Sequence, residues 1–99
     1  MDNQHKLIKG YRDLSQPEID LMNHIKEKES EMMALIWKVR QTLAEQQELS
    51  QTDKDLFHRL QQAEPARWCA MAKSHFQEGF MELVRSVAQP QSPNGNSAG

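Results

Sequence analysis

The sequence has too few cysteines for a disulfide and no hydrophobic run long enough for a transmembrane helix. Its single cysteine, Cys69, has no second thiol to pair with, which excludes an internal disulfide and a cysteine-based metal site. No apolar stretch approaches the ~20 residues of a membrane-spanning helix, and residues 1–6 lack the apolar stretch of a secretory signal. We therefore expect a soluble intracellular protein that is held together by packing.

An excess of positive charge is also missing. Twelve Lys and Arg residues stand against fourteen Asp and Glu residues, for a formal net charge of -2. This balance argues against the broad basic face of a protein that binds nucleic-acid polymers without sequence preference. An anionic ligand would have to be held by a few local cations.

Catalytic and metal-binding patterns are absent from the sequence as well. His5, His24, His58 and His75 are scattered, no HExxH or CxxC spacing occurs, and no Gly-rich loop precedes a helix. Cys69 and His75 are six positions apart, which places them far apart around a helix, so a small packed thiol is favoured over a nucleophile. We expect no metal, no cofactor and a protein that binds rather than catalyses.

What the sequence does contain is helix signals. Ser15, Pro17 and Glu18 match a capping box, with Pro17 where a backbone N–H is not needed. Apolar residues then recur at helical spacing without an internal Gly or Pro, which predicts one long helix to about Gln47. They are Ile19, Met22, Ile25, Met32, Ile36, Val39 and Leu43.

Two more helices are predicted after this one. Thr52 and Asp55 have capping-box spacing, which indicates a shorter helix that Pro65 interrupts, because proline disfavours helical geometry at Glu64. A third helix is then expected to run to about Ala88. Its apolar positions cover more than one stripe, which is typical of a helix that meets two neighbours. They are Trp68, Met71, Ala72, His75, Phe76, Gly79, Phe80, Leu83 and Val87.

The two ends of the chain differ in composition and in expected structure. Leu7 and Ile8 allow a short N-terminal helix that ends at Gly10, whereas residues 89–99 are rich in Pro, Gly and Asn and are expected to be disordered. We predict an all-α fold with a short N-terminal helix and long antiparallel helices, in a single oligomerising domain at residues 1–88. Oligomerisation is expected because a chain of 99 residues has a thin core.

Two residues are candidates for ligand binding. Tyr11, beside Arg12 on a polar stretch, suits stacking on a nucleic-acid base, although a packed tyrosine fits equally well. Arg67 falls in the first turn of a helix, where its charge opposes the helix dipole unless an anion binds there; an indifferent surface arginine remains the alternative. The alternating charges at 26–29 are typical of a solvated helix face.

The segments that hold these residues resemble a known family, the phage anti-CBASS cyclic-oligonucleotide sponges. The resemblance covers most of residues 1–90 and is looser between 29 and 62. The matching segments are GYRDLS at 10–15, IDLMN at 19–23 leading to Lys26, AEPARW at 63–68, AK at 72–73, GFM at 79–81, LVR at 83–85 and AQP at 88–90.

The resemblance implies a phage immune-evasion protein in the cytoplasm of the infected bacterial host. Such proteins form helical homohexamers that hold cyclic dinucleotides, such as cyclic GMP-AMP, in one interprotomer pocket and cyclic trinucleotides in another. The bound second messengers of the host's CBASS defence then no longer activate its effector. Carried over by residue, Tyr11 would stack on dinucleotide bases, Lys26 would pair with dinucleotide phosphates, and Arg67 would bind trinucleotide phosphates. Lys28, about 200° around the helix from Lys26, would face the second pocket.

Two other functions stay open at the level of sequence. A phage structural or regulatory helical oligomer, such as a scaffold or a DNA-binding protein, would use the same helices for association, although the acidic net charge counts against DNA. An enzyme that degrades cyclic nucleotides would need a metal cluster or an acid-base pair, and the sequence offers neither pattern.

Overall fold

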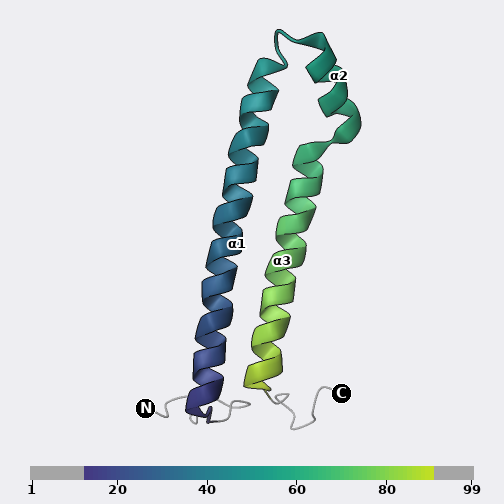
Figure 1. Cartoon of the computed structure of the whole chain (residues 1–99). Helices are drawn as coiled ribbons and strands as arrows, with labels where there is room; N and C mark the ends of the chain where they lie inside the picture. The colour runs from purple at the N-terminus through teal and green to yellow at the C-terminus, as the bar shows by residue number, and fades with distance from the viewer. Residues whose placement is uncertain (1–12, 91–99) are drawn as a thin grey trace. The chain divides into compact units, whose positions relative to one another are not determined.

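The computed structural model describes residues 13–90, and its regular structure is helical. The helices are α1 (Gln16–Leu49), α2 (Lys54–Ala63) and α3 (Pro65–Ala88) (Figure 1). No strand occurs within residues 13–90, so the predicted all-α class is confirmed for that part of the chain. The short helix predicted before Gly10 and residues 91–99 of the tail predicted at 89–99 lie outside the described residues.

The start of α1 is the capping box that the sequence predicts. The Ser15 backbone N–H donates to Glu18 Oε1 at 2.8 Å, and the Glu18 N–H donates to Ser15 Oγ at 3.3 Å. These reciprocal bonds satisfy two donors that the first helical turn leaves without partners. The helix continues to Leu49, two residues beyond the predicted end, because no Gly or Pro interrupts it.

The start of α2 corrects one prediction. The N-cap is Asp53, not Thr52: Asp53 has extended backbone angles (φ -126, ψ 104), and its side chain accepts a 3.0 Å hydrogen bond from Leu56 N–H. Thr52 lies in the preceding turn, where its hydroxyl donates to the Leu49 carbonyl at 3.4 Å. Both residue types can cap a helix, and the geometry of the turn decides between them.

The assignment of Asp53 as the N-cap leads to a prediction about stability. Asp53→Ala should lower the free energy of unfolding by about 1 kcal/mol, because a helix N–H loses its acceptor. Thr52→Ala should cost less than half as much, since only a long hydrogen bond in the turn is lost. Urea denaturation of both variants at one protein concentration measures the two effects. A larger loss for Thr52→Ala would contradict the assignment of the cap.

Glu64 joins α2 to α3 in a left-handed conformation. Its backbone angles are φ 47 and ψ 53, and its N–H donates to the Leu60 carbonyl at 2.9 Å. Pro65 disfavours right-handed helical geometry at the residue before it, as predicted, so the chain turns at Glu64 and a new helix begins at once. A non-glycine residue in this region stores roughly 1 kcal/mol of backbone strain.

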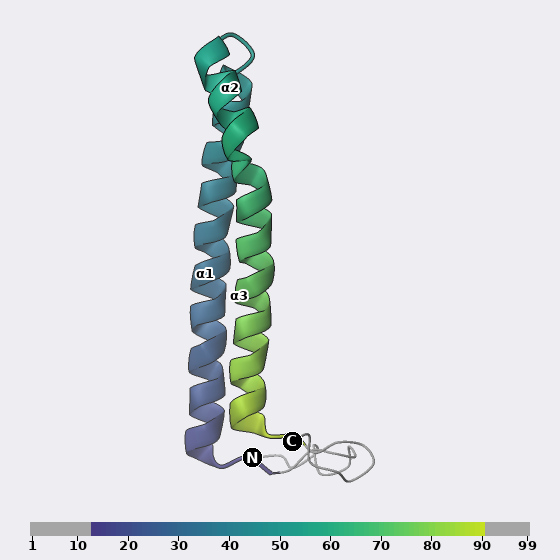
Figure 2. The same cartoon turned by 90° about the vertical axis from the view of Figure 1, so that its right-hand side faces the viewer.

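The contacts of the chain define two compact units, which we describe separately. Unit 1 includes the described residues 13–28 and 79–90, and unit 2 comprises residues 29–78. In unit 1 the first turns of α1 lie beside the last turns of α3 and run antiparallel to them (Figures 1 and 2). In unit 2 the rest of α1 is antiparallel to the first turns of α3, and α2 connects the two.

The apolar side chains of one copy of the chain are mostly left accessible. Every residue of the predicted α1 stripe except Val39 is buried or half-buried, yet Ile36 is the only apolar side chain of residues 13–90 that is fully buried, at 7% exposure. On α3, Trp68, Phe76 and Leu83 are exposed. No helix in the described part of the chain is long and apolar enough to cross a membrane.

Candidate functional site

The predicted ligand-binding residues are distributed over both units. Tyr11 lies outside the described residues. Lys26 and Lys28 are exposed residues of α1 in unit 1, and their spacing of two residues places them on different faces of that helix. Arg67 is in the first turn of α3, in unit 2. The structure therefore defines the surroundings of Arg67 in the most detail.

Arg67 is positioned by the junction between α2 and α3. The backbone N–H groups of Arg67 and Trp68 both donate to the Glu64 carbonyl, at 3.1 and 3.2 Å. The Arg67 guanidinium lies 3.6 Å from Glu64 Oε2 and 5.4 Å from the ring centroid of Trp68. The left-handed turn at Glu64 thus places one carboxylate and one aromatic ring beside the guanidinium.

These two contacts leave Arg67 available to a ligand. Its side chain is 58% exposed, and an exposed ion pair of this kind contributes only about 0–1 kcal/mol. The first turn of α3 contains no acidic residue, so Glu64 is the carboxylate that a bound anion would have to displace. The partial positive charge of the helix N-terminus would add to the attraction for that anion.

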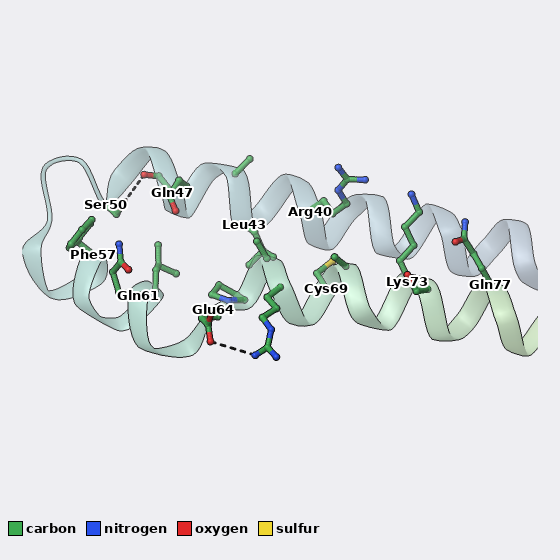
Figure 3. A pocket seen from close by; sticks show the side chains of 17 residues that line it. Arg40, Leu43, Gln47, Ser50, Phe57, Gln61, Glu64, Cys69, Lys73 and Gln77 are labelled. Carbon is green, nitrogen blue, oxygen red and sulfur yellow. Dashed lines mark hydrogen bonds and ion pairs between the residues drawn. The ribbon is translucent and has the colours of Figure 1, made fainter.

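Arg67 also lines a groove of about 880 Å³ in unit 2. The groove lies along α1, α2 and α3, with apolar side chains such as Leu43, Phe57 and Leu60 and neutral polar groups such as Gln47, Ser50 and Gln61 (Figure 3). Ser50 is held in place because its hydroxyl donates to the Gln47 carbonyl at 2.6 Å, and it is 5% exposed. Apolar walls with a few polar groups are typical of small-molecule sites.

The charge of the groove is positive. Arg40, Arg67 and Lys73 line it, and Glu64 is the only carboxylate among the lining residues. Figure 3 shows Arg40 and Lys73 extending to one side of the groove and Glu64, the partner of Arg67, to the other. Three cations at one groove attract an anion locally although the chain has a net charge of -2. This is the kind of site that an anionic ligand needs in an acidic chain.

Sequence reasoning did not select Arg40 or Lys73 as site residues. The spacing of the groove residues was a signal that the sequence did contain, because they recur with a helical period on each helix. They are Arg40, Leu43, Ala44 and Gln47 on α1, and Arg67, Ala70, Lys73, Ser74 and Gln77 on α3. The pattern marks a face of each helix but does not show that the two faces meet. Cys69 is half-buried at the groove, as expected for a small packed thiol.

Within residues 13–90, no group of three or more His, Cys, Asp or Glu side chains is arranged to hold a metal ion.

Comparison with known proteins covers most of the sequence. Residues 3–88 match the family model described as the Acb2/Tad1 hairpin domain. The chain is also similar to the protein named Anti-CBASS protein 2 of Pseudomonas phage JBD67. The two are 40% identical over 106 aligned positions, which cover 92% of this chain and 98% of the relative.

Proposed function

The chain belongs to the Acb2/Tad1 hairpin family, and from this premise we propose that it is a phage protein that sequesters the cyclic nucleotide messengers of the host's CBASS defence without degrading them. The ligands are cyclic dinucleotides and cyclic trinucleotides, and the site of action is the cytoplasm of the infected bacterium. The name of the Pseudomonas phage relative supports the anti-CBASS role, and the positive groove beside Arg67 supports an anionic ligand.

The observation that carries the proposal is the setting of Arg67. A guanidinium can donate two parallel hydrogen bonds to the oxygens of a phosphodiester. Because the ionic partner of Arg67 within residues 13–90 is an exposed carboxylate, a phosphate can take that place at little cost. We assign Arg67 to the cyclic trinucleotide.

The other proposed contacts belong to a second type of pocket. Tyr11 stacks on the bases of a cyclic dinucleotide and Lys26 pairs with its phosphates. Lys28, on a different face of α1 from Lys26, is assigned to the trinucleotide pocket together with Arg67. Both pockets form between copies of the chain in a homohexamer, which agrees with the small number of apolar residues that one copy buries.

Sequestration without chemistry makes a direct prediction. The pure protein is incubated with a mixed panel of cyclic dinucleotides and trinucleotides, separated from free nucleotide, heated and analysed by mass spectrometry. The bound cyclic nucleotides should be released intact and in constant amount, whatever the incubation time. Linear products that increase with time and with protein concentration would show an enzyme instead. Absence of any bound nucleotide would favour a structural oligomer.

A further inference from the structure

A second, smaller hollow lies in unit 2 beside the groove. It has a volume of about 280 Å³, and α1 contributes Trp37 and Arg40 while α3 contributes Lys73 and Gln77; Met33 and Ile36 form its apolar part. Trp37 and Arg40 are three residues apart, and Lys73 and Gln77 are four apart, so each pair shares one face of its helix. The hollow therefore combines an aromatic ring, two cations and one amide.

The ring of Trp37 is accessible and has no partner of its own within residues 13–90. Trp37 is 60% exposed, and no ring or cation–π contact involves it, in contrast to Trp68, whose ring lies under the Arg67 guanidinium. An exposed aromatic face can stack on another flat, polarisable group. A nucleic-acid base is such a group, and base–aromatic stacking is among the stronger contacts available to it.

Within residues 13–90, the two cations of the hollow have no negatively charged partner. No carboxylate lines the hollow, and no ion pair joins Arg40 or Lys73 to another residue of the described chain. Figure 3 shows Arg40, Lys73 and Gln77 extending to the same side, away from Glu64. Two like charges on facing helices repel each other, and a bound phosphate between them would replace that repulsion with attraction.

We propose that this hollow binds a single nucleotide, with its base on the Trp37 ring and its phosphate between Arg40 and Lys73. The amide of Gln77 can both donate to and accept from the edge of the base or the sugar. A volume of about 280 Å³ is just below the ~300–1,000 Å³ of small-molecule sites, which suits one nucleotide better than a cyclic trinucleotide. The hollow shares Arg40, Lys73 and Gln77 with the groove beside Arg67, but Tyr11, Lys26, Lys28 and Arg67 are not among its lining residues, so the proposal goes beyond the proposed function.

The test uses the fluorescence of Trp37. The chain has two tryptophans, so Trp68→Phe leaves Trp37 as the only one and keeps an aromatic ring beside Arg67. Titration with adenosine 5′-monophosphate at low salt should quench the emission to a plateau. Adenosine without phosphate should bind at least tenfold more weakly, and inorganic phosphate should compete, because the charge-assisted hydrogen bonds to Arg40 and Lys73 need the phosphate.

Substitutions then separate the two parts of the site. Arg40→Gln and Lys73→Gln should each weaken binding roughly tenfold, whereas Lys38→Gln, an exposed α1 lysine that does not line the hollow, should leave it unchanged. Each variant is first checked for native mass by light scattering. Failure to quench through the millimolar range, or equal weakening by Lys38→Gln, would overturn the proposal.

The same experiment distinguishes this site from the sequestration pockets. Arg67→Ala should leave the nucleotide-dependent quenching of Trp37 intact while it removes cyclic trinucleotide binding. If Trp37 does not respond but cyclic nucleotides bind, the hollow is not a nucleotide site and the proposed function stands. If Trp37 responds but no cyclic nucleotide binds, the hollow is a nucleotide site and the proposed function is wrong.

Discussion

Replacing Arg67 by alanine is expected to weaken cyclic trinucleotide binding by at least a hundredfold, about 3 kcal/mol, while cyclic dinucleotide binding changes little. A cyclic trinucleotide has three phosphates, so a pocket on a three-fold axis presents three copies of Arg67 to it, and the substitution removes all three guanidinium–phosphate contacts together. The fold should tolerate the change, because the ion pair to Glu64 and the contact with Trp68 are both at the surface.

The reciprocal variant tests the second pocket. Cyclic dinucleotides have, or nearly have, two-fold symmetry, so two copies of Tyr11 and Lys26 would meet one ligand. Tyr11→Ala should weaken dinucleotide binding by about 2–6 kcal/mol, because two stacking contacts are lost, and should spare the trinucleotide. Calorimetric titration of both variants with both ring sizes gives the comparison.

The matched control for Arg67 is Arg59, an exposed arginine of α2 that does not line the groove. Arg59→Ala removes the same charge from the same unit and should leave both affinities unchanged. If it weakened binding as much as Arg67→Ala, general electrostatic attraction would explain the result. If Tyr11→Ala or Arg67→Ala abolished binding of both ring sizes in a correctly assembled protein, the two-pocket proposal would be wrong.

Light scattering is expected to find the protein at a mass of several chains, with six copies of the 11.5 kDa chain as the predicted assembly. The reason is the distribution of apolar surface. Ile36 is the only apolar side chain that is fully buried within residues 13–90 of one copy, whereas Leu35, Leu49 and Trp68 are 53–62% exposed. Burying such residues against another copy contributes about 25 cal/mol per Å² of apolar area, and a single copy lacks this contribution.

Assembly also has a thermodynamic signature. If folding depends on association, the midpoint of thermal unfolding should rise with protein concentration, because mass action favours the oligomer. A monomer chain with its own core would unfold at a temperature that does not depend on concentration. A monomeric mass at micromolar concentration would contradict the assembly, and with it the two interprotomer pockets.

Comparison of prediction and structure shows which signals are local. The capping box at Ser15 and the turn before Pro65 depend on residues within four positions of each other, and both are confirmed. The cap of α2 was assigned one residue too early, because Thr52 and Asp53 both have suitable side chains. Which of them accepts the N–H depends on the path of the turn, which propensity does not specify.

The sequence by itself determined the helical class, the bounds of α3, the start of α1 and, through segments that resemble a family, the residues proposed for ligand binding. These features depend on short sequence patterns and on the chemical type of single residues. Only the tertiary structure decided that Arg40 and Lys73 lie at one groove with Arg67, and that Trp37 shares a hollow with two of those cations. The physical reason is that helical periodicity identifies a face of each helix, whereas the partner of that face depends on the packing of residues that are far apart in the sequence.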